Sequence, residues 1–188
     1  DEAKISGDNF SFLELERGEM LLGLSDGMGS GEQAREESES TVRMAERFLR
    51  AGISAADCVR TIGPALKLRT QGKKFVTLDI STIDLFTGEA VSVKCGAAPS
   101  FVRAADGDVS VRVRRILSST LPAGLEEAGD MDVTQFQMGS QDALVLLSDG
   151  IVDADGSNAG WVEELLADSV KLSARELAAR LVLEGSAR

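Results

Sequence analysis

From residue 75 onward, apolar and polar residues alternate with a period of two, and turn sequences interrupt the alternation. Two of these turns are Thr87-Gly88 and Asp106-Gly107, each between alternating segments. Such dipeptides in this setting are typical of β-hairpins. The pattern therefore predicts strands at residues 75–86, 90–95, 101–104, 109–113, 132–138 and 143–147.

Helical periodicity replaces this alternation between residues 32 and 68. Residues 32–51 carry an apolar stripe spaced three and four apart, which predicts one long helix. Ser54 and Asp57 have the spacing of a capping box, which opens a second helix to about residue 68. Pro64 lies inside this helix and predicts a kink or a break. The expected buried stripe of the first helix is Ala34, Ser38, Val42, Ala45, Phe48 and Leu49.

The remaining segments complete an order of two strands, two helices, about six strands and two helices. Residues 10–16 alternate and residues 20–24 are almost continuously apolar, as expected of the first two strands. Residues 161–170 and 174–183 predict the last two helices, with Ser173 as an N-cap. Because helices come in pairs instead of alternating with strands, we expect an α+β fold with helix pairs packed on mostly antiparallel sheets.

Residue types that the chain lacks exclude several chemistries. It has 188 residues and no His, which excludes a Ser-His-Asp triad and His-bound zinc. Neither Cys58 nor Cys95 has an Arg six residues later, so a cysteine-based phosphatase is excluded and both are expected to be reduced, buried thiols. The net charge of −11 argues against nucleic acid as a partner. Catalysis would have to depend on carboxylates or a cofactor.

The length of the chain predicts one domain with a sizeable core. No run of about 18 apolar residues occurs, so no membrane span is expected. The chain begins at Asp1 without a Met or a signal-peptide pattern, and we expect it to be a piece of a longer polypeptide.

The tripeptide Ser-Asp-Gly occurs twice, each time after an apolar segment that predicts a buried strand. Asp26 follows residues 21–24, and Asp149 follows residues 144–147. If the two strands were neighbours, the carboxylates would repel each other unless a cation lay between them. Oxygen ligands suit Mg²⁺ or Mn²⁺. The alternative is that each tripeptide is an ordinary Asp-Gly turn.

Three other segments are similar to motifs of other enzyme classes, and only the last of them stays open as an alternative. Gly23 to Gly27 fits the G-x-S-x-G nucleophile elbow, but the chain has no His to act as its base. The glycines from Gly27 to Gly31 match neither a dinucleotide fingerprint nor a P-loop. Asp153-Ala-Asp155-Gly-Ser157 is similar to the D-x-D-G-T motif of aspartyl phosphatases, with Asp153 as the nucleophile, although few residues follow it.

Several segments together resemble the metal-dependent PPM (type 2C) protein phosphatases, and most of all their bacterial SpoIIE branch. The resemblance covers nearly the whole chain, in the family's order. Its motifs are Ser6-Gly7-Asp8, Ser25-Asp26-Gly27-Met28-Gly29-Ser30-Gly31, Leu68-Arg69-Thr70, Thr77-Leu78-Asp79, Gly96-Ala97-Ala98-Pro99-Ser100-Phe101, Ser119-Thr120-Leu121-Pro122 with Gly124, and Leu147-Ser148-Asp149-Gly150.

The resemblance implies an α-β-β-α sandwich and two Mn²⁺ or Mg²⁺ ions bridged by a water that attacks phosphoserine or phosphothreonine. Asp26 resembles the bridging carboxylate, and the carbonyl of Gly27 resembles a ligand of the second metal. Asp149 resembles a ligand of the first metal. Asp8 resembles the acid that holds metal-bound waters. The catalytic residues implied in this way are Asp8, Asp26 and Asp149.

One departure from the family concerns the end of the sequence. The family has a further metal-binding Asp on its last strand, in a segment that would begin near Arg188. We therefore expect residues 1–188 to be a single phosphatase domain that lacks the family's first strand and this last one. If the Asp is truly absent, a weakly active or inactive regulatory module becomes the alternative to an enzyme.

The resemblance also suggests the setting in which the protein works. It implies a phosphoserine substrate on a STAS-type anti-anti-sigma factor, in a bacterial partner-switching pathway linked to sporulation. It implies a cytoplasmic domain that is attached to a membrane only through regions outside this chain. A dimer is also compatible with the resemblance.

Overall fold

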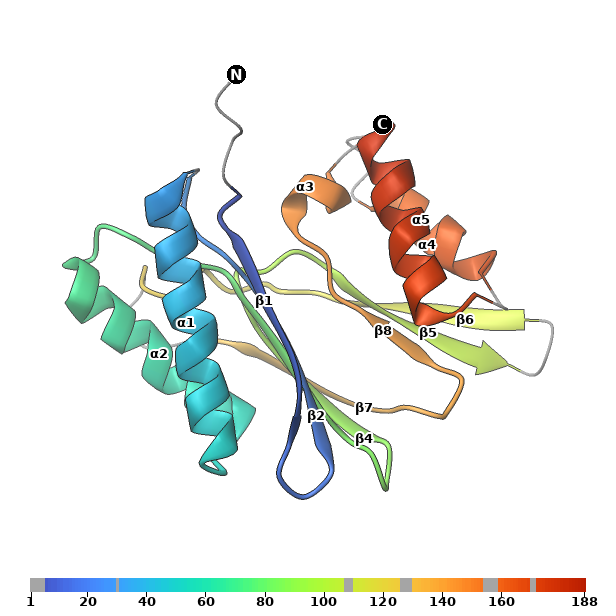
Figure 1. Cartoon of the computed structure of the whole chain (residues 1–188), viewed down its shortest axis with the longest axis horizontal. Coiled ribbons are helices and arrows are strands. Elements are labelled where there is room, and N and C mark those ends of the chain that lie inside the picture. Colours follow the sequence, from blue (N-terminus) through green and yellow to red (C-terminus); the bar gives the residue numbers. More distant parts are fainter. Residues whose placement is uncertain (1–5, 30, 107–109, 126–129, 154–158, 170–171) are drawn as a thin grey trace. The chain divides into compact units, whose positions relative to one another are not determined.

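The computed structural model describes residues 6–29, 31–106, 110–125, 130–153, 159–169 and 172–188 (Figure 1). The chain divides into two compact units, Asp1–Ala97 with Leu117–Gln137 and Ala98–Ile116 with Met138–Arg188. Each unit contains one antiparallel sheet with helices packed on it. The predicted α+β fold class is therefore confirmed.

The first unit is built on a five-stranded sheet in the order β1-β2-β3-β4-β7. All of its neighbouring strands are antiparallel. The hairpin predicted around Thr87-Gly88 is confirmed as β3 and β4. The elements of this unit are β1 (Asp8–Leu15), β2 (Glu19–Asp26), α1 (Glu32–Arg50), α2 (Ala55–Thr70), β3 (Leu78–Asp84), β4 (Glu89–Cys95) and β7 (Asp132–Gln137).

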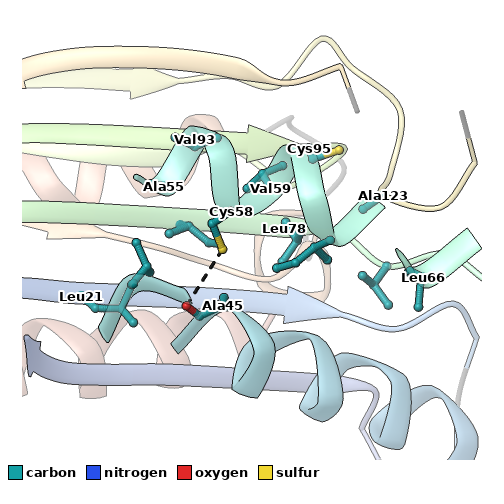
Figure 2. Close-up of a cluster of buried hydrophobic side chains, with 14 of the residues drawn as sticks. Leu21, Ala45, Ala55, Cys58, Val59, Leu66, Leu78, Val93, Cys95 and Ala123 are labelled. Carbon is teal, nitrogen blue, oxygen red and sulfur yellow. Dashed lines mark hydrogen bonds between the residues drawn. The ribbon is translucent and has the colours of Figure 1, made fainter. Parts of the chain in front are cut away.

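The helices α1 and α2 cover one face of this sheet, and the unit's hydrophobic core lies between them and the strands (Figure 2). The predicted stripe of α1 is buried except for Phe48, which is partly buried and packs against the core. The side chain of Ser54 accepts a hydrogen bond from Asp57 N, as the capping pattern predicts. Both cysteines are free and buried, and burial raises the pKa of Cys58 to about 12.

A proline lies within α2 without breaking it. Of the two outcomes predicted at Pro64, a kink or a break, the break is wrong, because the helix is continuous from Ala55 to Thr70. Proline cannot donate a hydrogen bond to the carbonyl of Arg60, but Arg60 is exposed and its carbonyl can be hydrated instead. Burial of Ile62 and Leu66 on the opposite face favours the continuous helix.

The face of the sheet opposite the helices carries a buried ion pair. Successive side chains of a strand point to opposite faces, so Asp79 and Lys94 point away from the core that holds Leu78 and Val93. Lys94 Nζ lies 2.5 Å from Asp79 Oδ2, and neither side chain is more than 2% exposed. Burial lowers the pKa of Lys94, and the charge of Asp79 offsets part of this shift.

The second unit has a three-stranded antiparallel sheet in the order β6-β5-β8. The predicted hairpin of β5 and β6 is confirmed, although residues 107–109 of its turn lie outside the described residues. Helix α4 packs on β5 and β6, and α3 packs on α5. The elements of this unit are β5 (Ser100–Asp106), β6 (Ser110–Ile116), β8 (Ala143–Val145), α3 (Asp149–Val152), α4 (Gly160–Ala167) and α5 (Ala174–Ser186).

Near the end of the chain, the start of α5 agrees with the sequence prediction, but the segment after β8 does not. The predicted N-cap of α5 at Ser173 is confirmed, and it is part of a capping box, because Ser173 and Glu176 each accept a hydrogen bond from the other's backbone N–H. The strand predicted at residues 143–147 ends at Val145, and the short helix α3 that follows was not expected. No helix within the described ranges is long and apolar enough to cross a bilayer.

The buried ion pair predicts a large, specific effect on stability. We expect Asp79→Asn to lower the free energy of unfolding by about 3–5 kcal/mol, because the buried ammonium of Lys94 loses its hydrogen-bonded counter-charge, and its interaction with the charge of Asp132 is weaker. The double variant Asp79→Leu, Lys94→Met removes both charges and should regain most of that loss. Urea denaturation of the three proteins measures the effect. An Asp79→Asn protein that unfolds at the wild-type urea concentration would contradict the assignment.

Candidate metal centre

Two of the predicted acids face each other across the first pair of strands. Asp8 is the first residue of β1 and Asp26 the last of β2, and they are directly opposed in the antiparallel register. Gly27 N donates a hydrogen bond to Gly7 O, so the preceding pair, Asp8 and Asp26, occupies a non-hydrogen-bonded position. At such positions the Cα atoms are only about 4.5 Å apart and the side chains lie close together.

This placement is unfavourable for two carboxylates alone. Like charges directly opposite each other destabilise a sheet, and both Asp8 and Asp26 are half-buried, which weakens screening by solvent. A divalent cation held by carboxylate and carbonyl oxygens removes the repulsion. The donor chemistry at this end of the sheet therefore fits Mg²⁺ or Mn²⁺ and not a metal that prefers nitrogen or sulfur ligands.

A third oxygen converges on the same place. A Cβ atom added to Gly7 would lie 3.0 Å from the carbonyl oxygen of Gly27 and 3.1 Å from Asp26 Oδ1. The missing side chain of Gly7 thus leaves room for a small cradle lined by a carboxylate oxygen, a backbone oxygen and the Cβ of Ala34, which such a Cβ would approach to 3.2 Å. Both oxygens are ligand types that hard divalent cations take.

Gly27 itself has no room for a side chain. A Cβ atom there would lie 2.1 Å from the backbone oxygen of Ala34, in the first turns of α1. The close approach of α1 therefore requires glycine at this position. It also fixes the peptide whose carbonyl oxygen contributes to the cradle.

Hydrogen bonds from neighbouring segments hold both aspartates in place. Thr77 clamps Asp26, because its hydroxyl accepts from Asp26 N at 3.0 Å and its own N–H donates to Asp26 O at 2.8 Å. On the other strand, the buried hydroxyl of Ser38 in α1 donates to the carbonyl of Gly7. Asn9 Nδ2 donates to Ser38 Oγ at 2.6 Å, which ties β1 to the same helix.

The third predicted acid lies in the other unit and in a different local structure. Asp149 is exposed and is the first residue of α3, with Ser148 at the N-cap. The strands that precede Asp26 and Asp149 are β2 and β8, which belong to different sheets, so the two carboxylates do not meet on neighbouring strands of one sheet. Asp149 as a metal ligand therefore stays a prediction.

Within the described ranges, no three Cys, Asp or Glu side chains lie close enough together to hold a metal ion by themselves. The structure brings together the carboxylates of Asp8 and Asp26 and the backbone oxygen of Gly27. In the aspartyl phosphatase motif, only Asp153 is described, and residues 154–158 lie outside the described part. Ser30 of the longest motif also lies outside it.

The sequence did not predict a function for Gly7, Asn9, Ser38 or Thr77, which lie around the cradle. Gly7 and Thr77 stand in motifs that carry the family resemblance, so a signal was present without a function attached to it. For Ser38 the signal was only its place in the buried stripe of α1. Asn9 had none.

The sequence of the chain matches the family model of Stage II sporulation protein E (SpoIIE) over residues 16–185. The chain belongs to the SpoIIE family. It is 38% identical over 149 residues to Stage II sporulation protein E of Priestia megaterium and 36% identical over 149 residues to that of Bacillus subtilis (strain 168). Each alignment covers 79% of this chain, but only 25% and 17% of the respective relative, so the chain spans a quarter or less of their length.

Solved structures identify the part of SpoIIE to which the chain corresponds. The PP2C phosphatase domain of B. subtilis SpoIIE, solved with a fragment of its regulatory domain, has a TM-score of 0.81 at 32% identity, over 96% of this chain and 53% of that one. The phosphatase domain in a crystal form without domain swapping has a TM-score of 0.66 at 30% identity, over 96% and 77%. The predicted membership of the type 2C serine/threonine phosphatases is confirmed.

The same fold recurs at lower identity. RsbX, solved in complex with magnesium, has a TM-score of 0.76 at 17% identity, over 97% of this chain and 82% of that one. At this identity the likeness shows the fold alone.

The cradle predicts that a single methyl group at Gly7 weakens metal binding. In Gly7→Ala the Cβ would crowd both Gly27 O and Asp26 Oδ1, and we expect at least about a tenfold loss of Mn²⁺ affinity. Gly23→Ala is the matched control, because its Cβ would meet only Ser11 Cβ at an ordinary 3.6 Å. Isothermal titration of Mn²⁺ into each variant measures the effect. Equal affinities for the two variants would contradict the cradle.

Proposed function

We propose that this SpoIIE-family domain hydrolyses phosphoserine or phosphothreonine in a protein and uses divalent metal ions held at Asp8, Asp26 and Gly27. The observation that carries the proposal is the facing pair of carboxylates beside the Gly7 cradle, in a chain of the type 2C phosphatase family. The chain has no His to activate a Ser or Cys nucleophile, and Cys58 and Cys95 are both buried.

The residues have distinct roles in this proposal. Asp26 would contribute a carboxylate oxygen to the metal ions and Gly27 its carbonyl oxygen, and Asp149 would be a further ligand. Asp8, directly opposite, would orient water through hydrogen bonds. Bound Mn²⁺ or Mg²⁺ lowers the pKa of water and neutralises charge on a phosphoryl group. RsbX, which shares the fold, has been solved with magnesium, in agreement with this choice of ion.

We further propose that the substrate is a regulatory protein, namely a phosphorylated STAS-type anti-anti-sigma factor, and that the domain works in the cytoplasm. The B. subtilis relative is described as a cell fate determinant and was solved with part of its regulatory domain, which supports a signalling role. The charge of −11 would repel nucleic acid. Residues 1–188 would form one phosphatase domain that can form a dimer, with any membrane attachment made through regions outside this chain.

Release of phosphate from a serine-phosphorylated STAS protein tests the proposed function. We expect the full-length protein to be active with Mn²⁺, and Asp26→Asn to lower kcat by at least about 100-fold, since it removes a direct metal ligand. Asp8→Asn should cost about 10- to 100-fold, as expected of a group that orients the ligands. The matched control is Glu14→Gln, which changes a carboxylate at the other end of β1. Wild-type turnover in Asp26→Asn would overturn the proposal.

The alternative is a phosphatase-like module that binds its partner without hydrolysis. The observation that favours it is that no group of three acidic side chains gathers within the described residues. A full-length wild-type protein that binds the phosphorylated STAS protein but releases no phosphate, with either Mn²⁺ or Mg²⁺, would establish this alternative.

A further inference from the structure

A short segment between α2 and β3 runs directly beside the candidate metal centre. We call residues 74–77 the strap. Phe75 O accepts a hydrogen bond from Met28 N at 3.1 Å, and Thr77 bonds both backbone groups of Asp26. Gly27 forms an isolated β-bridge with Val76. The strap therefore pairs with Asp26 and Gly27, which carry the proposed metal-binding oxygens, and with Met28, which follows them.

The first residue of the strap is anchored to α1 through Glu37. Glu37 Oε1 lies 3.3 Å from Lys74 Nζ, and the other carboxylate oxygen pairs with the guanidinium of Arg69, near the end of α2. Arg69 Nη1 also donates to Ser40 Oγ at 2.5 Å, one turn along α1. One carboxylate thus joins α1, the end of α2 and the start of the strap.

This cluster differs from the other ion pairs on α1. The side chain of Glu37 is only 17% exposed and has two cationic partners, both distant in sequence. Glu39, two residues later, forms an ordinary pair with Arg43 four residues along the same helix, and the side chain of Arg43 is 67% exposed. Exposed pairs of this second kind contribute little to stability, whereas loss of Glu37 releases a connection between separate elements.

We propose that Glu37 is a positioning residue for the metal centre: through Lys74 and Arg69 it holds the strap against Asp26-Gly27-Met28. This inference rests on the proposed function of that site. Without the anchor, the strap's hydrogen bonds to Met28 and Asp26 open more often, and the oxygens of Asp26 and Gly27 spend less time in the arrangement that a cation requires. Misplacement of catalytic groups by about 1 Å can cost about 100-fold in rate.

Amide hydrogen exchange of the metal-free protein tests this directly. The amides of Met28 and Thr77 donate two hydrogen bonds between the strap and the site, and a third runs from Asp26 N to the hydroxyl of Thr77. We expect the Met28 and Thr77 amides to exchange at least about threefold faster in Glu37→Gln than in wild type, whereas the control Glu39→Gln leaves them unchanged. Lys74→Met keeps the apolar stem of the side chain but removes the ammonium, and we expect it to give the same change. It replaces Glu37→Gln in the test if that variant does not fold.

Two further measurements separate positioning from a general loss of stability. The Mn²⁺ concentration for half-maximal phosphatase activity should rise at least about threefold in Glu37→Gln, and Glu37→Asp should recover part of the difference. Unchanged exchange and unchanged Mn²⁺ dependence in both Glu37→Gln and Lys74→Met would overturn the inference. If the wild type has no phosphatase activity, the proposed function fails, but the exchange measurement still decides the role of Glu37.

Discussion

Two carboxylates face each other where the first two strands pair, and the surrounding structure keeps them there. Asp8 and Asp26 are opposed at a non-hydrogen-bonded position, where side chains are closest. Two negative charges so placed oppose the pairing of β1 and β2. The packing of α1 against Gly27 and the clamp of Thr77 on Asp26 hold the backbone against this repulsion. The proposed cation site is therefore held in place by the fold itself.

The two faces of the five-stranded sheet serve different purposes. The face under α1 and α2 is apolar and supplies the core that fixes the strands. The opposite face carries the two aspartates at one end of β1 and β2, and the buried pair of Asp79 and Lys94 near the same end of β3 and β4. Polar groups on a buried face are costly unless they are paired. The apolar face therefore supplies most of the stability, and the polar face carries the proposed metal centre.

Local sequence signals predicted most of the fold. Helix α1 follows from its apolar stripe, α5 from the cap at Ser173, and the hairpins from their turn dipeptides. Each of these depends on residues within a few positions of one another. The continuous helix through Pro64 was not predictable in this way, because tertiary burial of Ile62 and Leu66 outweighs the proline's local preference.

The site depends on contacts that are distant in sequence, and there the sequence was a weaker guide. The two Ser-Asp-Gly tripeptides look alike, yet Asp26 ends a strand of one sheet and Asp149 begins a short helix in the other unit. The residue directly opposite Asp26 is Asp8, and this follows from a strand register that the tripeptide does not encode. Likewise, Thr77 lies 51 residues from Asp26, and Lys74 lies 37 residues from Glu37.

The central claim is that the facing carboxylates of Asp8 and Asp26 form a cation site. Thermal unfolding with and without Mn²⁺ tests it most directly, in the wild type and in Asp26→Asn. Without metal, Asp26→Asn should be more stable by up to about 1 kcal/mol, because it relieves the like-charge pair.

With Mn²⁺ at about 100 times its dissociation constant, the wild type should gain about 2.7 kcal/mol, or roughly 5–11 °C in Tm. Asp26→Asn should gain little. A wild type that does not respond to Mn²⁺, or an Asp26→Asn variant with the full gain, would contradict the account.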